Sequence, residues 1–296
     1  MESLDQRANL FGRRAIVIGG GDAIGRAVTL ALAEVGVDIA FCDIDAAAAQ
    51  RTCAEVLALG RRCMALTADA TDSAQLAAFY DNAGRFLQGA EIVINVVGGV
   101  RMRPFMDKDP AECAIELQRN FGYVIESVRH AVPLLRKGGR GGCIINFTTI
   151  EAERAAGGFA VYAGAKAATT NFSRAMAWEL GPEGIRVNVI APDTTDSPGN
   201  RNALPPEVHA MGADLPAEIW TRAMQMVIPL QAPPNREDLA NAVLFLASDL
   251  AKSITGQVLH VDGGTSAAAG MIRWPYDGGL TLPVPMGNTL KKLFPR

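Results

Sequence analysis

The chain has 296 residues, of which 49% are hydrophobic and 20% are charged, an ordinary composition for a globular protein with a sizeable core. The formal net charge is −3 and the basic residues are scattered, so the sequence offers no electrostatic footprint for nucleic acid or an anionic membrane. The five cysteines include no CxxC pair and no histidine stands at metal-ligand spacing, which argues against a disulfide framework and against a metal site.

The sequence also lacks the marks of a membrane or secreted protein. No stretch approaches the roughly 18 uncharged apolar residues of a membrane-spanning helix. Glu2 and Asp5 precede any apolar run, unlike the start of a signal peptide. We therefore expect a soluble cytoplasmic protein.

Apolar runs of strand length alternate with longer segments of helical periodicity, the pattern of successive β-α-β units with a parallel sheet. No linker is long enough to separate two domains, so we expect a single doubly wound, Rossmann-like α/β domain over residues 1–266, with about seven strands. The expected strands cover residues 15–18, 37–42, 63–66, 91–95, 143–147, 186–190 and 257–261, and the expected helices cover 24–35, 46–59, 73–86, 111–135 and 161–180.

Two stretches depart from this pattern and are expected to be loops. Residues 193–216 are rich in proline, glycine and asparagine, and we expect a substrate lid over about 193–230. The tail, 267–296, carries more apolar side chains than water would tolerate. We expect it to cross a subunit interface or edge a neighbour's pocket, and the alternative is that it folds back on its own subunit.

A glycine cluster stands between the first expected strand and the first expected helix. Gly19, Gly20, Gly21 and Gly25 allow a tight turn and let a pyrophosphate reach the free N–H groups of the helix N-terminus. A plain strand-to-helix turn is the alternative. The position at the start of a β-α-β unit favours dinucleotide binding.

Asp43 ends the second expected strand, where a Rossmann-type fold presents an acid to the adenosine ribose hydroxyls. A carboxylate at about 4 Å from a 2′-phosphate repels it by about 4 kcal/mol at an effective dielectric near 20, before screening. Asp22 adds an acid to the glycine loop. We therefore expect NAD to be preferred to NADP. The alternatives are that Asp43 is solvated or caps the next helix, and that Arg26 offsets its charge.

Tyr162 and Lys166 stand four residues apart in the helix expected at 161–180, hence on one helix face. A free phenol titrates near pH 10, and a nearby ammonium lowers the pKa of the phenol by favouring the phenolate. The pair thus suits proton exchange with a substrate at neutral pH. Taken alone, the same spacing is more often a surface or core-edge pair.

In its context, this pair resembles that of the short-chain dehydrogenase/reductase family, of the Tyr-x-x-x-Lys type. The resemblance extends from about residue 10 to residue 264. The features that carry it follow in the family's order and spacing: the loop from Gly19 to Gly25, Asp43, Asp69-Ala70, Asn95 to Gly98, Asn120, Thr149, Tyr162 with Lys166, Arg186 to Asn188, Pro192, and residues 254–257 and 261–264.

The resemblance implies four catalytic residues. Tyr162 is the general acid/base, Lys166 holds the nicotinamide ribose and tunes the phenol, Asn120 supports a water-linked proton relay, and Thr149 steadies the substrate oxygen. The cofactor contacts expected with them are Gly19, Gly21, Asp22, Ile24, Gly25, Asp43, Ile44, Asp69, Ala70, Asn95, Val97, Gly98, Tyr162, Lys166, Pro192, Thr195 and Ser197.

Several positions depart from the usual family pattern. Thr149 stands where serine is usual; it keeps the hydroxyl donor and adds a methyl group that restricts χ1, so we expect function to survive. Asp193 puts a carboxylate where glycine is usual, in the loop that approaches the nicotinamide. The other departures are Ile18, Ala23, Val96 and Val97.

Substrate contacts are expected from the loops above the strand ends. Apolar residues of the lid suit a bulky apolar alcohol, such as a steroid-like or cyclic aromatic compound, or they pack the lid against the body. Arg101, Arg103 and Arg154 either bind a substrate carboxylate or are solvated. The expected substrate contacts are Gly99, Arg101, Glu151, Met211 and Trp220.

Together these features predict an NAD-dependent oxidoreductase that interconverts a secondary alcohol and a ketone, with oxidation as the favoured direction. The enzyme alternatives are a 3-oxoacyl thioester reductase and a dihydrodiol dehydrogenase. The alternative outside enzymes is a catalytically silent nucleotide-binding protein of the same fold. We expect a homo-oligomer, either a tetramer or a dimer.

Overall fold

The computed structural model describes residues 2–195, 197, 203, 216–268, 270, 272–273 and 280–281. Seven strands form one parallel sheet in the order β3-β2-β1-β4-β5-β6-β7. The chain winds from β1 outward to β3 and then crosses back to β4 on the other side of β1, so the order reverses between β1 and β4. The strands are β1 (Arg14–Ile18), β2 (Asp38–Asp43), β3 (Cys63–Thr67), β4 (Ile92–Asn95), β5 (Gly142–Phe147), β6 (Ile185–Pro192) and β7 (Val258–Val261).

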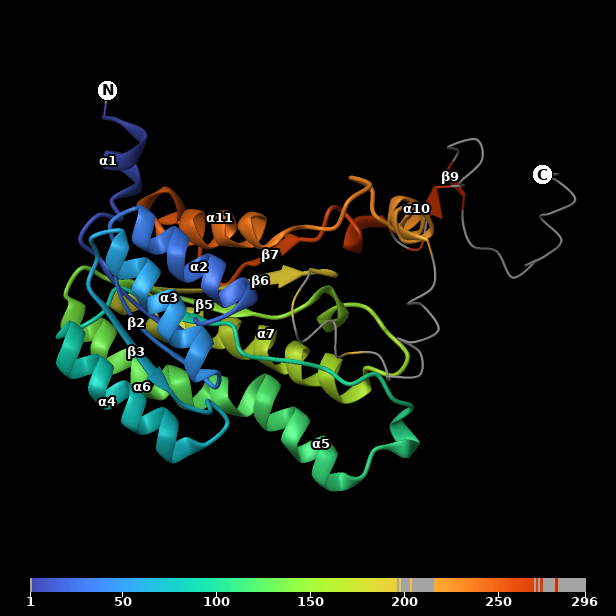
Figure 1. The fold of residues 1–296 in the computed structure, drawn as a ribbon, viewed down its shortest axis with the longest axis horizontal. Coiled ribbons are helices and arrows are strands. Elements are labelled where there is room, and N and C mark those ends of the chain that lie inside the picture. Colours follow the sequence, from blue (N-terminus) through green and yellow to red (C-terminus); the bar gives the residue numbers. More distant parts are fainter. Residues whose placement is uncertain are drawn as a thin grey trace, which may run out of the picture.

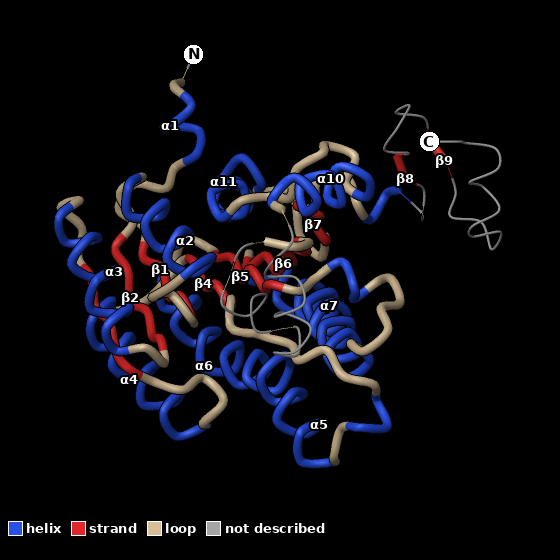
Figure 2. Tube along the Cα trace, turned by 45° about the vertical axis from the view of Figure 1, so that its right-hand side comes forward, coloured by secondary structure: helices blue, strands red, loops and turns tan. Residues whose placement is uncertain are grey.

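Helices cover both faces of this sheet (Figures 1 and 2), which confirms the predicted doubly wound Rossmann-like fold. On one face lie α2 (Ala23–Glu34), α3 (Ala46–Ala58) and α11 (Arg236–Ala247). On the other face lie α4 (Ser73–Leu87), α6 (Tyr123–Gly138) and α7 (Ala160–Leu180). The other α-helices within the described residues are α1 (Leu4–Ala8), α5 (Pro110–Leu117) and α10 (Ala217–Val227).

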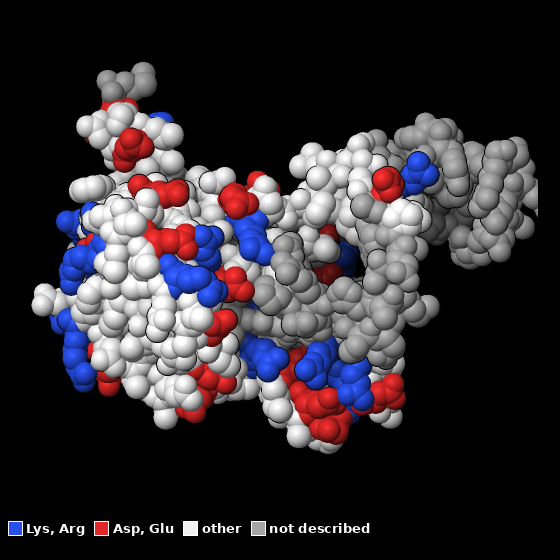
Figure 3. Space-filling view, viewed as in Figure 1, with Lys and Arg blue, Asp and Glu red and all other residues white. Residues whose placement is uncertain are grey.

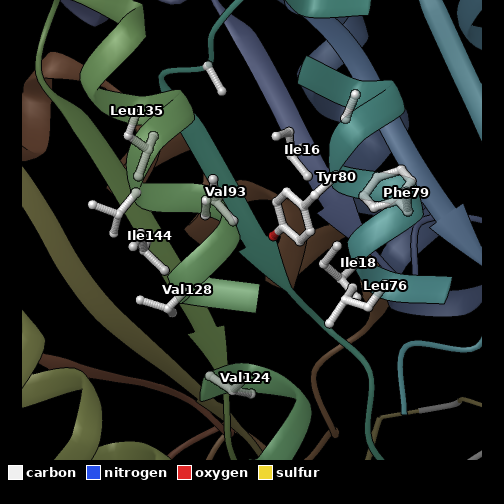
Figure 4. Close-up of a cluster of buried hydrophobic side chains, with 14 of the residues drawn as sticks. Ile16, Ile18, Leu76, Phe79, Tyr80, Val93, Val124, Val128, Leu135 and Ile144 are labelled. Carbon is white, nitrogen blue, oxygen red and sulfur yellow. The ribbon is translucent and has the colours of Figure 1, made fainter. Parts of the chain in front are cut away.

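The core is divided by the sheet, because successive strand residues point to opposite faces. In β1, Ile16 and Ile18 pack toward α4 and α6, whereas Ala15 and Val17 pack toward α2 and α11. Figure 4 shows the first of these clusters, with the ring of Tyr80 beside Ile16 and Ile18. Both faces of the strands are buried, which explains why the strands read as continuous apolar runs.

A chain of buried hydrogen bonds links the helices to the centre of the sheet. The hydroxyls of Tyr80 and Ser127 lie 2.7 Å apart, and Ser127 donates to Asn95 Oδ1 at 2.6 Å. Asn95 donates to Asn146 at 2.8 Å, which donates in turn to Ser173 at 2.8 Å. Each polar group is satisfied inside the core, so the chain fixes α4, α6 and α7 relative to β4 and β5.

The single helix predicted at 111–135 is wrong in one respect, because a π-helical turn, Gln118–Gly122, separates α5 from α6. The side chain of Gln118 folds over Gly122, where an added Cβ would lie 1.9 Å from Gln118 Oε1. Such wider turns are frequent at functional sites. This one carries Asn120.

No helix bounds were predicted between residues 190 and 257, where the structure has α10 and α11. A signal for α11 was present: Asn235 accepts from the N–H of Asp238, whose side chain accepts from the N–H of Asn235, a capping box. In the tail, two short strands, β8 (Ile272–Arg273) and β9 (Leu280–Thr281), pair antiparallel where only a loop was expected.

The described surface shows no large region of a single charge on the face drawn in Figure 3, where basic and acidic side chains are intermixed. Among the described helices, none combines the length and the apolar character needed to span a lipid bilayer.

Candidate active site

The carboxyl ends of β1, β4, β5 and β6 meet around one cavity of about 330 Å³, which we call the strand-end cavity. In open α/β sheets the ligand site lies at this end, beside the point where the strand order reverses. The cavity is lined by Ile24, Val96, Gly98, Gly99, Val100, Phe147, Thr148, Thr149, Glu151, Phe159, Tyr162, Lys166, Pro192, Asp193, Thr194, Thr195, Ser197 and Ala203.

Three of the four predicted catalytic residues line this cavity together. Helix α7 begins at Ala160, so Tyr162 and Lys166 lie on the same face of its first turns. Thr149 follows the end of β5 and lines the cavity together with Tyr162. The Lys166 ammonium is buried and donates to the carbonyl of Phe147 at 2.9 Å. The structure thus places a phenol, an alcohol and an ammonium around one space.

Burial raises the pKa of Tyr162 well above its ordinary value. The hydrogen bond with Thr149 lowers that pKa in part, whereas the negative charges of Glu151 and Glu116 raise it further. The predicted lowering by Lys166 is therefore wrong for this structure: the cost of placing a phenolate in a buried site dominates. The Lys166 ammonium lies against the Phe147 carbonyl instead.

Burial also lowers the pKa of Lys166, from 10.5 to about 8. In that interval the unfolded chain binds the lysine proton more tightly than the folded one, so this group makes the folded state more stable as pH rises. Below pH 8 the buried, charged Lys166 lowers the free energy of unfolding by on the order of 3 kcal/mol.

We therefore expect Lys166→Met to be more stable than the wild type below pH 8, with a difference that shrinks as pH approaches 10.5. Urea unfolding of both proteins across this range, without added dinucleotide, measures the effect. Other groups titrate in the same interval, but they are common to both proteins and cancel in the difference. A difference that does not change with pH contradicts the assignment.

Asn120 is buried and clamps the loop that follows β4. Its Oδ1 accepts from the N–H of Gly99 at 3.1 Å, and its Nδ2 donates to the carbonyl of Gly99 at 2.9 Å. A Cβ added to Gly98 would lie 2.9 Å from Lys166 Nζ and 3.0 Å from Asn120 Oδ1. Asn120 thus holds a tight loop against the lysine without lining the cavity itself. Its role in a proton relay stays a prediction.

The glycine loop after β1 fits a dinucleotide pyrophosphate. A Cβ on Gly25 would lie 1.7 Å from the carbonyl oxygen of Gly19, so only glycine allows α2 to begin this close to β1. Asp22 precedes α2, and its exposed side chain makes no capping hydrogen bond. The first N–H groups of α2 therefore have no side-chain cap, as a phosphate-binding helix N-terminus requires.

Asp43 lies beside this loop at the end of β2. Its Oδ2 accepts from the N–H of Gly21 at 2.8 Å and its Oδ1 accepts from the N–H of Asp45 at 3.0 Å. Asp45, and not Asp43, caps α3, since it accepts from the first N–H groups of that helix. Arg26 pairs with Glu55, so its charge is committed away from Asp43. Asp43 therefore does not cap α3, and Arg26 does not offset its charge.

The remaining predicted cofactor residues differ in position. Asn95 belongs to the buried hydrogen-bond chain, and Val97 packs in the core with its carbonyl accepting from Tyr123 at 2.8 Å, so neither lines the cavity. Three other predicted cofactor residues lie outside the cavity, on the same edge of the sheet at the ends of β2 and β3. They are the exposed Ile44, the turn-forming Asp69 and the buried Ala70. The structure brings to the cavity Ile24, Gly98, Tyr162, Lys166, Pro192, Thr195 and Ser197.

Of the expected substrate residues, Gly99 and Glu151 line the cavity, whereas Arg101 is exposed and does not. Arg103 and Arg154 are engaged in ion pairs with Glu112 and Glu151. Met211 lies outside the described residues, as does the side chain of Trp220, whose backbone belongs to α10. Residues 196, 198–202 and 204–215 of the predicted lid and most of the tail from residue 267 also lie outside them.

Several lining residues were not singled out from the sequence, among them Phe159 and Thr148. Phe159 has its ring 6.3 Å from that of Tyr162. Thr148 is buried, and among the described residues its hydroxyl has no hydrogen-bond partner. Its position directly after β5 was the available signal, because residues at strand carboxyl ends gather at the site. A buried polar atom without a protein partner suits a site that holds a polar ligand.

Comparisons with known proteins agree with this geometry. A family model described as enoyl-(acyl carrier protein) reductase matches residues 19–266. The 7alpha-hydroxysteroid dehydrogenase of Escherichia coli K12 is 31% identical over 255 residues, which cover 86% of this chain and 94% of that protein. The D-erythrulose reductase of Gallus gallus is 33% identical over 258 residues, which cover 86% of this chain and 95% of that protein.

The same fold is found in a solved structure of a 7 alpha-hydroxysteroid dehydrogenase complexed with NADH and 7-oxo glycochenodeoxycholic acid. It superposes with a TM-score of 0.78 at 31% identity, covering 89% of this chain and 98% of that one. The predicted Tyr, Lys and Thr lie together at the strand ends, where this fold binds its ligands. The chain therefore belongs to the short-chain dehydrogenase/reductase family, and it is an oxidoreductase of that type.

Proposed function

We propose that the protein is an NAD-dependent oxidoreductase that interconverts a secondary alcohol and a ketone on a bulky, cyclic apolar substrate. The observation that carries this proposal is the placement of Tyr162, Thr149 and Lys166 around the strand-end cavity. A substrate oxygen between the two hydroxyls has a proton-exchanging group and a second polar partner within reach.

When bound, the nicotinamide exchanges a hydride with the substrate carbon. In alcohol oxidation, the phenolate form of Tyr162 accepts the hydroxyl proton at its phenolic oxygen, and in ketone reduction the neutral phenol returns that proton to the substrate oxygen. Thr149 orients the substrate oxygen toward Tyr162. Lys166 holds the nicotinamide ribose with an ammonium that is already buried in the site. Asn120 fixes the Gly98-Gly99 loop that forms the cavity wall.

Asp43 supports NAD as the preferred dinucleotide. Its carboxylate is oriented by the N–H of Gly21 and retains acceptor capacity for ribose hydroxyls, while Arg26 is paired elsewhere. The relative with the solved structure binds NADH. Oxidation is the proposed direction, because the cellular NAD pool is kept mainly oxidised.

The cavity wall supports a cyclic apolar substrate. Val96, Val100, Phe147 and Phe159 supply its apolar surface. The similar 7alpha-hydroxysteroid dehydrogenase acts on a steroid.

The competing functions are less well supported. Asp43 and the scattered basic residues disfavour a 3-oxoacyl thioester reductase. The presence of Tyr162, Lys166, Thr149 and Asn120 disfavours a silent nucleotide-binding role. A dihydrodiol dehydrogenase is the second candidate, because a carboxylate, Glu151, also lines the cavity.

The test is an NAD-linked absorbance screen of secondary alcohols spanning steroids, dihydrodiols and hydroxyacyl thioesters. We expect NADH formation with cyclic secondary alcohols, weak activity with thioesters, and a lower rate with NADP. A protein that binds NAD but oxidises no alcohol in the panel is a silent nucleotide-binding protein.

We further propose a cytoplasmic homo-oligomer, with residues 1–266 as the catalytic domain and 267–296 as an interface arm. The five cysteines are free thiols, as in a reducing compartment. Trp178 on α7 is 87% exposed in the single chain, and an indole of this size is rarely left in water. Sedimentation equilibrium is expected to show a dimer or tetramer that Trp178→Glu weakens; a wild-type monomer contradicts the proposal.

A further inference from the structure

Glu151 is the one carboxylate of the strand-end cavity that touches the catalytic residues, among the residues that the structure describes. Its Oε2 accepts a hydrogen bond from the hydroxyl of Thr149, and its side chain is 16% exposed. It also acts electrostatically on Tyr162. The Glu151 carboxylate therefore contacts Thr149, the residue whose hydroxyl lies beside the reacting substrate oxygen.

The other oxygen of this carboxylate is held by an arginine. Arg154 Nη2 donates to Glu151 Oε1 at 3.0 Å, and the Arg154 side chain is 45% exposed. The ion pair with Arg154 fixes the Glu151 carboxylate in the cavity wall and compensates its charge. A neutral hydrogen-bond donor of the substrate therefore suits Glu151 better than a second cation does. An ionised carboxylate offers about four acceptor positions, and the described contacts use two of them.

Hydrogen-bond lengths limit the distance between the Glu151 carboxylate and the reacting substrate oxygen. A reacting oxygen that contacts both Tyr162 and Thr149 lies about 2.6 to 3.2 Å from each. Glu151 accepts from the same Thr149 hydroxyl, so its carboxylate lies within about two hydrogen-bond lengths, roughly 6 Å, of the reacting oxygen. A hydroxyl on the carbon next to the reacting carbinol carbon spans this gap and donates to the carboxylate.

We infer that Glu151 recognises a second hydroxyl of the substrate, so that the substrate class is a cyclic vicinal diol rather than a simple alcohol. This inference rests on the proposed function and narrows it. The apolar wall of Val100 and Phe159 covers the ring. The second hydroxyl takes the place of Thr149 as donor to Glu151, which leaves the Thr149 hydroxyl free to donate to the reacting oxygen beside Tyr162. A hydrogen bond to a charged acceptor in a buried site discriminates strongly against a substrate that lacks the donor.

The competing role for Glu151 is positional: it orients Thr149 and does not touch the substrate. The two roles differ in which substrates they affect. A positioning role changes the oxidation of every alcohol by the same factor, and so does any change in the pKa of Tyr162. Recognition of a second hydroxyl changes only the oxidation of diols.

The experiment compares three probes: cyclohexanol, trans-1,2-cyclohexanediol and trans-2-methoxycyclohexanol, with NAD at one pH. The methoxy compound keeps the second oxygen and removes its proton. The variant is Glu151→Gln, and the matched control is Glu153→Gln, which changes an exposed neighbouring carboxylate that pairs with His260 at 3.3 Å. Values of kcat/KM are measured for each protein with each probe.

The wild type and Glu153→Gln are expected to oxidise the diol about ten- to a hundredfold more efficiently than the methoxy compound. Glu151→Gln is expected to lose most of that preference while its kcat/KM for cyclohexanol changes much less. Equal wild-type values for diol and methoxy compound overturn the inference, as does an equal loss on all three probes. If only alcohols of the screen other than these probes are oxidised, the inference about Glu151 is wrong and the proposed function stands. If no alcohol is oxidised at all, both the inference and the proposed function are wrong.

Discussion

Tyr162→Phe is expected to lower kcat/KM for alcohol oxidation by about 10²- to 10⁴-fold, the range that general acid/base catalysis contributes. The change removes one oxygen from a half-buried side chain and keeps the ring that lies beside Phe159. The substrate hydroxyl then has no phenolic oxygen to accept its proton. Binding of NAD, measured by fluorescence titration, is expected to stay within a few fold.

Tyr80→Phe is the matched control. It also removes a buried phenolic hydroxyl, one that bonds with Ser127 at 2.7 Å in the core under the sheet. We expect it to cost about 1 kcal/mol of unfolding free energy, because one buried hydrogen bond is lost, and to leave kcat/KM nearly unchanged. If Tyr162→Phe retains more than a tenth of the wild-type kcat/KM, Tyr162 is not the proton-exchanging residue.

Asp43→Ser is expected to relax the choice of dinucleotide. It removes the negative charge that opposes a 2′-phosphate and keeps a hydroxyl for the ribose. The unscreened repulsion is about 4 kcal/mol at 4 Å, and solvent at the strand end reduces it, so we expect the ratio of kcat/KM for NAD over NADP to fall by about ten- to a hundredfold. Parallel kinetics with the two dinucleotides and one alcohol measure the ratio.

Asp81→Asn provides the comparison for this change, because it removes the same charge from an exposed position on α4. Its ratio is expected to match that of the wild type. An Asp43→Ser ratio that also matches the wild type means that the ribose contact lies at another residue. Such a result leaves the assignment of Tyr162 untouched.

The fold was predictable because its signals are local. Strands buried on both faces read as apolar runs, and the predicted and observed strand bounds agree closely, as for residues 15–18 against Arg14–Ile18. The site followed from the strand-end rule together with the family's ordered motifs. Tyr162, Lys166 and Thr149 therefore meet in the structure as the sequence predicted.

The features that the sequence did not reveal depend on contacts between distant segments. The π-helical turn at Gln118–Gly122 interrupts a pattern that reads as one helix. The pKa of Tyr162 depends on how deeply its phenol is buried, which no spacing along the chain reports. Asn95 matches a cofactor motif by position, yet its amide is committed to Ser127 and Asn146.

Hydride transfer between a carbinol carbon and a bound nicotinamide is tested most directly with a substrate alcohol from the screen that carries deuterium on the carbinol carbon. This alcohol is incubated with the wild-type protein and NAD. Mass spectrometry of the reduced dinucleotide shows where the label goes. We expect one deuterium to appear in the reduced dinucleotide for each ketone formed. Unlabelled reduced dinucleotide, or ketone formed without any reduced dinucleotide, contradicts direct hydride transfer.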